Sequence, residues 1–466
     1  MMRTFNFQDY DFNTIKDNLH NLKRLLWKWE YTAGYYQRLA EGFSFIHAPR
    51  KKLPHANPLT ELLLSFFADN RALNILEMKQ VFSEEMIEKL EQAQLIIRTA
   101  KEEYLSVFRI FPLNQYLLLV PFRRYCEPQV YIGAESPVFQ KYIRVITHPK
   151  KILDLATGSG FQLFGLPWQG PSHSMLGIDL NPNAVAVATL SAQWNNCEWM
   201  TFKEGDITKD LTNINEKFDL ITGHLPILPT ANNTRYKNTI HNDGGTDGFT
   251  VIRKVFPVIP EILKPQGTFQ LILISLGDEK QPSLLSEIKT LFENNNLQGR
   301  VIAIKKIPVE LDAYYRGKKD EEYNKWMKFY KTQKKTYWYR LILRAEKANQ
   351  SDIHEKRLTY IELYRTDFSK PPSPISLEKL HREMNHYLTD TIVLSKTSKE
   401  DFDDLSNKLR AEVIQSENLK KPITNYGKEL AEKLPEIFPN SGSAIRFWGQ
   451  LTASKWQPKY LERKLW

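Results

Sequence analysis

The stretch Ile152-Leu153-Asp154-Leu155-Ala156-Thr157-Gly158-Ser159-Gly160 decides the fold. An apolar run of β-strand type enters a glycine-rich turn, and Phe161-Gln162-Leu163-Phe164 then continues as a helix. Glycine tolerates dihedral angles that other residues avoid and lets a ligand approach the main chain. A helix that begins beside such a turn favours a negatively charged group. The stretch therefore predicts a unit of strand, turn and helix that binds a ligand.

Strand-like and helix-like segments alternate from Lys150 to about Arg344, which predicts an α/β domain with a Rossmann-like doubly wound sheet. The strand candidates are residues 151–155, 174–179, 218–222 and 268–274, with residues 300–307 and 337–343 as a closing hairpin around a basic insertion.

A nicotinamide or flavin enzyme would also begin with a strand, a glycine turn and a helix. The dinucleotide fingerprint requires a third glycine three residues after the second, because the backbone must accommodate a pyrophosphate. Leu163 stands at that position. The spacing therefore counts against a dinucleotide.

The glycine turn resembles the first motif of class I S-adenosylmethionine-dependent methyltransferases, and the next two strands support this resemblance. Asp179 ends a strand 25 residues after Asp154, as the family pattern requires, and Asp206 falls at the end of the following strand. The resemblance implies that Asp154 lies near the methionine end of the cofactor, that Asp179 accepts the ribose hydroxyls, and that Asp206 holds the adenine amino group. The cofactor-binding residues that the resemblance implies are Asp154, Ala156, Gly158, Ser159, Gly160, Asp179, Leu180, Asp206 and Ile207.

The strand at residues 218–222 leads into the acceptor region, where the sequence departs from the family. Enzymes that methylate amide or exocyclic amino nitrogens carry Asn or Asp, two prolines and an aromatic residue here, whereas this chain reads His224-Leu225-Pro226-Ile227. We expect His224 and Pro226 to be the catalytic residues. An imidazole can accept a proton near neutral pH, so His224 is either a base toward the acceptor or a structural histidine that caps the strand.

A polar, glycine-rich loop, His241-Asn242-Asp243-Gly244-Gly245-Thr246-Asp247-Gly248-Phe249, precedes the next helix. Together with the flanking segments, it makes residues 59–344 most similar to relatives of the protein-glutamine (HemK-like) methyltransferases. Loss of the usual acceptor motif argues against an amide-nitrogen target but does not remove the case for catalysis, because methyl transfer mainly requires alignment and exclusion of water.

The remaining chain divides into three further parts. Helical spacing of leucines predicts one long helix from Asp11 to about Leu39, and the proline-rich residues 47–58 predict a loop. Two helices, the second capped by Ser83, and a pair of strands at residues 95–98 and 107–111 around the turn-like residues 101–103 resemble a small α+β winged-helix domain. We expect an N-terminal helical segment (1–57), a winged-helix-like domain (58–125), the methyltransferase domain (126–346) and a mainly helical C-terminal extension (347–466).

Charge and cysteine content limit the kinds of partner and the compartment that we expect for this chain. The net charge of +10 favours acidic partners such as nucleic acid, but excess lysine also simply solvates a surface, and four glutamates on the second helix of the winged-helix-like segment oppose phosphate binding. Cys126 and Cys197 build neither a disulfide framework nor a metal site. We therefore expect no metal, and a reducing cytoplasm fits the two cysteines best. No signal peptide or membrane span is evident, so we expect a soluble protein.

These features predict transfer of a methyl group from S-adenosylmethionine to a protein side chain or a small molecule. Two alternatives remain open. The basic and aromatic residues 318–339 favour a nucleic-acid methyltransferase, and the altered acceptor motif favours a non-catalytic binding module on a methyltransferase scaffold. The sequence does not indicate the oligomeric state.

Overall fold

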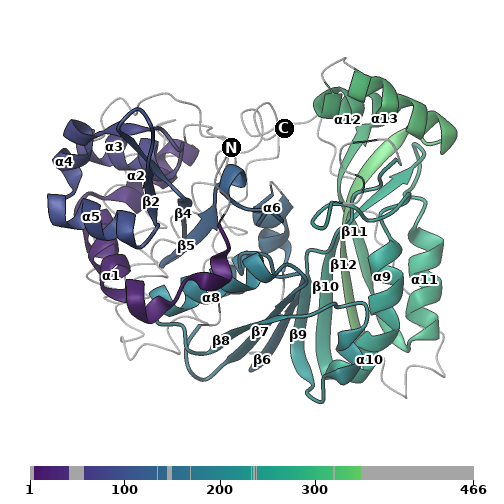
Figure 1. Cartoon of the computed structure of the whole chain (residues 1–466). Coiled ribbons are helices and arrows are strands. Elements are labelled where there is room, and N and C mark those ends of the chain that lie inside the picture. Colours follow the sequence, from purple (N-terminus) through teal and green to yellow (C-terminus); the bar gives the residue numbers. More distant parts are fainter. Residues whose placement is uncertain are drawn as a thin grey trace, which may run out of the picture.

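The computed structural model describes residues 5–40, 57–133, 135–143, 149–167, 169–231, 234, 237, 239–317 and 321–347. It contains an N-terminal helical and β part and a mixed α/β part that lie side by side (Figure 1). The prediction of a helical C-terminal extension and most of the predicted loop at residues 47–58 lie outside the described residues.

A seven-stranded sheet forms the centre of the α/β part, in the order β11-β12-β10-β9-β6-β7-β8. Strands β10, β9, β6, β7 and β8 run parallel, whereas β12 pairs antiparallel with both β10 and β11. The strands are β6 (Lys151–Leu155), β7 (Ser174–Asp179), β8 (Met200–Glu204), β9 (Phe218–Gly223), β10 (Leu263–Gly277), β11 (Leu297–Pro308) and β12 (Tyr337–Lys347). The predicted doubly wound sheet and its closing hairpin are confirmed.

Helices cover both faces of this sheet (Figure 1). The helices of this part are α6 (Glu135–Tyr142), α7 (Phe161–Gly165), α8 (Pro182–Trp194), α9 (Thr250–Val255), α10 (Ile259–Ile262), α11 (Leu285–Asn294), α12 (Val309–Gly317) and α13 (Glu321–Thr332), of which α12 and α13 lie at the end of β11 and β12 (Figure 1). The chain reverses its direction of winding between β6 and β9, and ligands of such sheets bind at the carboxyl ends of the strands at this switch point.

The N-terminal part has five helices and two small antiparallel sheets among the described residues. The helices are α1 (Phe12–Lys28), α2 (Tyr31–Ala40), α3 (Pro58–Phe67), α4 (Ile75–Val81) and α5 (Glu84–Gln92), and the strands are β1 (Leu73–Asn74), β2 (Ile96–Arg98), β3 (Glu103–Ser106), β4 (Phe108–Leu113) and β5 (Tyr116–Pro121). Ser83 caps α5 as predicted, because its side chain accepts a hydrogen bond from the Met86 N–H. The winged-helix-like assignment stays a prediction.

Two predictions for the N-terminal part are wrong in detail. The long helix expected from Asp11 to Leu39 is two helices, since α1 ends at Lys28 and Glu30 takes a left-handed conformation (φ 52°) that a helix cannot continue through. Strand β2 pairs with β3, and the segment that begins at Phe108 forms a separate hairpin with β5. Alternating apolar residues identify strands but do not specify their partners.

Helix α8 joins the two parts. Its Trp194 is fully buried and donates a hydrogen bond through Nε1 to the Leu19 carbonyl in α1, at 2.8 Å. The Leu119 N–H of β5 donates to Ser191 Oγ at 2.9 Å, and the Phe7 N–H donates to Asn183 Oδ1 at 3.3 Å. A continuous apolar core runs from α1 through β5 to α8. The N-terminal part therefore holds one face of the sheet, and with it the strand ends that form the site.

Candidate active site

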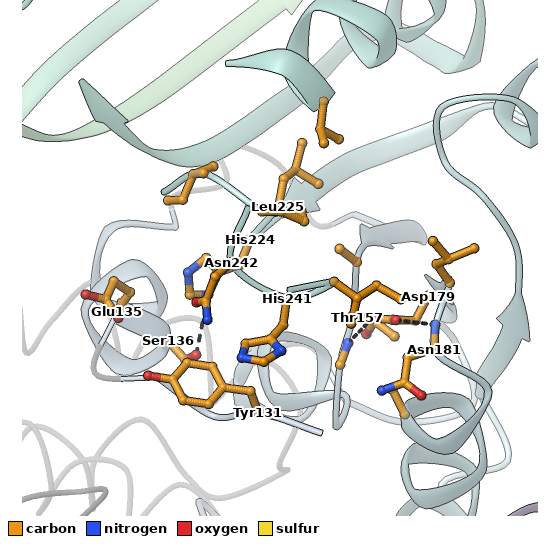
Figure 2. A pocket seen from close by; sticks show the side chains of 18 of the residues that line it. Tyr131, Glu135, Ser136, Thr157, Asp179, Asn181, His224, Leu225, His241 and Asn242 are labelled. Atoms are coloured by element: carbon orange, nitrogen blue, oxygen red, sulfur yellow. Dashed lines mark hydrogen bonds between the residues drawn. The ribbon is translucent and has the colours of Figure 1, made fainter. Parts of the chain in front are cut away.

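A cavity of about 300 Å³ lies at the carboxyl ends of β6, β7, β8 and β9. Figure 2 shows its two sides, with Asp179 and Asn181 on one and Glu135, Ser136 and His224 on the other. The predicted cofactor residues that line the cavity belong to the first side, and the predicted catalytic residues belong to the second. We call these the cofactor half and the acceptor half.

Asp179 organises the cofactor half. It ends β7, and its carboxylate accepts hydrogen bonds from the Gly158 N–H and the Asn181 N–H, both at 2.8 Å. These bonds tie the glycine turn after β6 to the end of β7. Burial raises the pKa of Asp179, although both backbone bonds favour its charged form. The next side chain, Leu180, is 50% exposed and lines the cavity, which leaves an apolar surface for a planar group.

The glycine turn requires its glycines for two different reasons. Gly158 (φ 57°) lines the cavity and presents its main chain there. Gly160 (φ 77°) lies behind the cavity wall, where a Cβ atom would approach the rings of Phe164 and Phe202 to 3.0 Å. Gly158 therefore shapes the ligand surface, while Gly160 allows close packing beneath it.

Asp206 follows β8 by two residues and is ionised. Its Oδ1 accepts hydrogen bonds from the Thr208 N–H (2.9 Å) and the Thr208 hydroxyl (2.7 Å), and its Oδ2 forms an ion pair with Lys209 at 2.7 Å. These groups lower the pKa of Asp206 to about 2. The carboxylate is thus held at the rim of the cavity beside the buried Ile207.

Asp154 lies beneath the cavity wall rather than on it. It is 1% exposed, and its Oδ1 accepts a hydrogen bond from Thr222 Oγ1 on the neighbouring β9 at 2.7 Å. Burial raises its pKa to about 7, against the effect of the Thr222 hydrogen bond. A positive charge at the base of the cavity would favour the ionised form of Asp154.

His224 opens the acceptor half, directly after β9. Its ring is partly exposed to the cavity, and its Nδ1 lies 3.4 Å from the Ser136 hydroxyl of α6. Burial lowers its pKa to about 4, although Glu135 opposes this effect. The imidazole is therefore neutral at physiological pH and can donate or accept a hydrogen bond at the cavity. Desolvation makes the ring a weaker base than an exposed histidine, so of the two roles expected for His224 this environment favours hydrogen bonding over proton abstraction.

An ion pair closes the acceptor half. Glu135, the first residue of α6, pairs with Arg340 of β12, with Oε1 and Nη2 2.6 Å apart. Arg340 is 5% exposed, so the pair is largely removed from solvent. Burial would raise the pKa of Glu135, but Arg340 keeps it below its usual value. The pair fixes α6 against the sheet beside His224.

The glycine-rich loop clamps the segment that carries the altered acceptor motif. The Leu228 N–H donates to the Asn242 carbonyl at 2.9 Å, and the Gly244 N–H donates to the Leu228 carbonyl at 3.0 Å. A Cβ atom on Gly244 would lie 2.9 Å from the Ile227 Cα. Gly244 is therefore required for close contact, and Pro226 and Ile227 are held at the cavity wall.

Several residues of the acceptor half were not predicted. Tyr131 precedes β6 and stacks on His241, with ring centroids 5.3 Å apart and an interplanar angle of 28° (Figure 2). Arg316 of α12 and Trp338 of β12 also line the cavity. His241 stood in the quoted polar loop, which was a usable signal, but the others belong to no local motif and are brought together by the fold.

Most predicted site residues meet at this cavity. Those that line it are Ala156, Gly158, Ser159, Asp179, Leu180, Asp206, Ile207, His224 and Pro226. Asp154 and Gly160 do not line it. Buried polar atoms also remain at its base: Ser159 Oγ and Gln162 Oε1 have no hydrogen-bond partner within the described part of the chain. Such atoms fit a ligand that carries donors and acceptors of its own.

Comparison with known proteins is consistent with this geometry. Residues 146–345 match the family model described as a methyltransferase domain. A Methanocaldococcus jannaschii protein described as a candidate protein N5-glutamine methyltransferase is 29% identical over 186 residues, which are 40% of this chain and 89% of that protein. The release factor glutamine methyltransferase of Geobacter sulfurreducens is 29% identical over 147 residues, which are 30% of this chain and 50% of that protein.

Among solved structures, the YcgJ protein of Bacillus subtilis aligns with 18% sequence identity and a TM-score of 0.30, covering 46% of this chain and 98% of that chain. The chain thus spans half the length of the Geobacter relative but most of the archaeal one. The predicted enzyme class and its cofactor, S-adenosylmethionine, are confirmed for residues 146–345. Within the described residues, no helix combines the length and the apolar character needed to cross a membrane.

Proposed function

We propose that this chain, in which residues 146–345 form a methyltransferase domain, transfers a methyl group from S-adenosylmethionine to a protein side chain. The observation that carries the proposal is a single cavity in which Asp179, at the end of β7, and His224, at the end of β9, line opposite sides. The relatives named as protein-glutamine methyltransferases support a protein as the acceptor.

In the proposed complex, the nucleoside occupies the cofactor half. Asp179 accepts hydrogen bonds from the ribose hydroxyls, Leu180 packs against the adenine, and Asp206 receives its amino group. The Ser159 hydroxyl at the cavity base, which has no hydrogen-bond partner among the described residues, faces the amino-acid end. The sulfonium of the bound cofactor supplies an electrophilic methyl group and a good leaving group.

The protein's own work is then to align the acceptor and to exclude water. His224 is neutral, so its ring can hydrogen-bond an uncharged acceptor without charge repulsion. Ser136 beside Nδ1 orients the ring, and the pair between Glu135 and Arg340 holds α6 in place. Trp338 and Ile227 provide apolar walls that keep solvent from the methyl group.

A label-transfer experiment tests the proposal. The full chain is incubated with methyl-labelled S-adenosylmethionine and fractionated lysate, and the product is treated separately with protease and nuclease. We expect label in a fraction that protease degrades and nuclease leaves intact. Absence of transfer with intact cofactor binding would contradict the proposal and support the non-catalytic binding module.

A second candidate is methylation of nucleic acid. Lys328 and Lys331 are exposed on α13, and Lys334 is exposed just beyond it, in the insertion that precedes the cavity residue Trp338. If these lysines contact phosphates, labelling should be sensitive to nuclease, and binding should weaken steeply as salt rises. Label that resists nuclease excludes this candidate.

A further inference from the structure

Gln162 is a buried polar residue whose amide has a hydrogen-bond partner at only one of its two ends among the described residues. It is the second residue of α7, is 3% exposed, and lines the cavity directly after the glycine turn. A buried side-chain amide normally has partners for both its oxygen and its nitrogen.

The orientation of the Gln162 amide follows from its neighbour. One end of the amide lies 3.1 Å from the Ser136 carbonyl, which can only accept a hydrogen bond, so this end is the Nε2 donor. Oε1 is therefore the opposite end, and it has no partner among the described residues. A hydrogen-bond donor in the cavity would satisfy it.

Gln162 lies where the two halves of the cavity meet. It follows β6, and it bonds Ser136, whose hydroxyl is 3.4 Å from His224 at the end of β9. Asp179 and Asp206 follow β7 and β8, on the other side of β6 in the sheet. When the nucleoside occupies those two strand ends, the amino-acid end of the cofactor comes to β6 and its ammonium N–H groups are the available donors.

We propose that Gln162 recognises the α-ammonium group of the cofactor, accepting its hydrogen bond through Oε1 while Nε2 holds Ser136. The proposal rests on the proposed function, which places the nucleoside at Asp179 and Asp206. Gln162 thereby connects the cofactor to the first turn of α6, which also carries the Ser136 hydroxyl beside His224.

Gln140 provides a matched control. It is also a helical glutamine whose Oε1 has no partner among the described residues, but it lies on α6 against Gly165 and does not line the cavity. We compare Gln162→Leu and Gln140→Leu by calorimetry with two ligands. S-adenosylhomocysteine carries the ammonium group, whereas 5′-methylthioadenosine lacks the amino-acid end.

We expect Gln162→Leu to weaken S-adenosylhomocysteine binding about tenfold or more, as for loss of a hydrogen bond to a charged group, and to leave methylthioadenosine binding within about twofold. Gln140→Leu should change neither. Gln162→Met, which is similar in size and also lacks the amide, should reproduce the result if Gln162→Leu folds poorly.

Unchanged S-adenosylhomocysteine binding in Gln162→Leu and Gln162→Met, or equal weakening of both ligands, would overturn the proposal while the proposed function stands. Failure of the wild-type protein to bind S-adenosylhomocysteine would instead overturn the proposed function and this inference with it.

Discussion

The two halves of the cavity are assembled from different kinds of structure. The cofactor half comes from the ends of three consecutive parallel strands, each followed within a few residues by its functional group. The acceptor half combines the end of β9 with the loop before α6, α6 itself, α12 and β12, which are far apart in the sequence. Short local segments of the sequence specify the cofactor half, whereas the acceptor half depends on the packing of the whole domain.

The hydrogen bonds show the same difference. In the cofactor half, Asp179 bonds main-chain N–H groups at Gly158 and Asn181. In the acceptor half, side chains hold one another: Glu135 pairs with Arg340, and Ser136 lies beside His224. Main-chain bonds tolerate changes in neighbouring side chains, so the cofactor half can persist while the acceptor half diverges.

Asp179→Ala should give the largest effect and is confined to the cofactor half. The variant loses the ribose acceptor and releases two main-chain N–H groups, so affinity for S-adenosylhomocysteine should fall about a hundredfold, as for loss of more than one hydrogen bond to a charged group. Isothermal titration calorimetry measures this change.

Glu216→Ala is the control for Asp179→Ala. Glu216 is an exposed carboxylate of the same domain that pairs with Lys151 at 2.6 Å, outside the cavity. Its replacement should leave the affinity unchanged. Asp179→Asn tests folding, because it keeps the size of the side chain. If Asp179→Ala bound the ligand within threefold of wild type, Asp179 would not be a cofactor residue.

The contrast between the halves also explains what the sequence could predict. Strands β6 and β7 were predicted to the residue, because strands buried on both faces are continuous apolar runs bounded by turns. The end of β7 identified Asp179, and the end of the following strand, β8, identified Asp206. By contrast, α4 was missed, since a helix of seven residues is too short for a periodic pattern.

The acceptor half could be predicted only where it follows a strand. His224 and Pro226 were found because they come directly after β9. Tyr131, Glu135 and Trp338 have no motif of their own, and their roles depend on the packing of α6 and β12 around the strand ends. The pKa of His224 likewise depends on burial that the sequence does not express.

His224→Ala should reduce methyl transfer without weakening cofactor binding, and so distinguish the acceptor half from the cofactor half. Methyl transfer should fall about tenfold to a hundredfold, since an orienting hydrogen bond to the acceptor is lost, while affinity for S-adenosylhomocysteine should stay within about twofold. Steady-state kinetics and calorimetry on the same variant measure the two quantities. His20→Ala, on α1 far from the cavity, is the control.

The pH dependence sharpens this test. Because the pKa of His224 is lowered to about 4, its ring stays neutral from pH 6 to pH 8. The ratio of wild-type to His224→Asn activity should therefore be constant over that range. A step in this ratio near pH 6.5 would show that His224 titrates as an ordinary histidine and acts as a base.

Asp154→Asn should give the smallest effect, a change in the pH dependence of stability. The pKa of Asp154 is raised from 3.8 to about 7, so between these values the unfolded chain ionises while the folded chain keeps the proton. Asp154 therefore lowers stability as pH rises from about 4 to about 7. Asp154→Asn lacks this loss, so its melting temperature relative to wild type should rise over the same interval, by up to about 10 °C at about 2–4 °C per kcal/mol for a domain of this size.

Bound cofactor should reduce the difference in melting temperature between Asp154→Asn and the wild type. A ligand ammonium group near the base of the cavity favours ionised Asp154, so S-adenosylhomocysteine should stabilise the wild type more than Asp154→Asn above pH 7. Thermal unfolding of both proteins at pH 5 and pH 8, with and without ligand, measures this. Equal stabilisation of the two proteins at pH 8 would mean that Asp154 supports the strand through Thr222 and does not interact with the ligand's charge. The Asp154 carboxylate would then serve the fold, and only groups that line the cavity wall would recognise the charge of the cofactor.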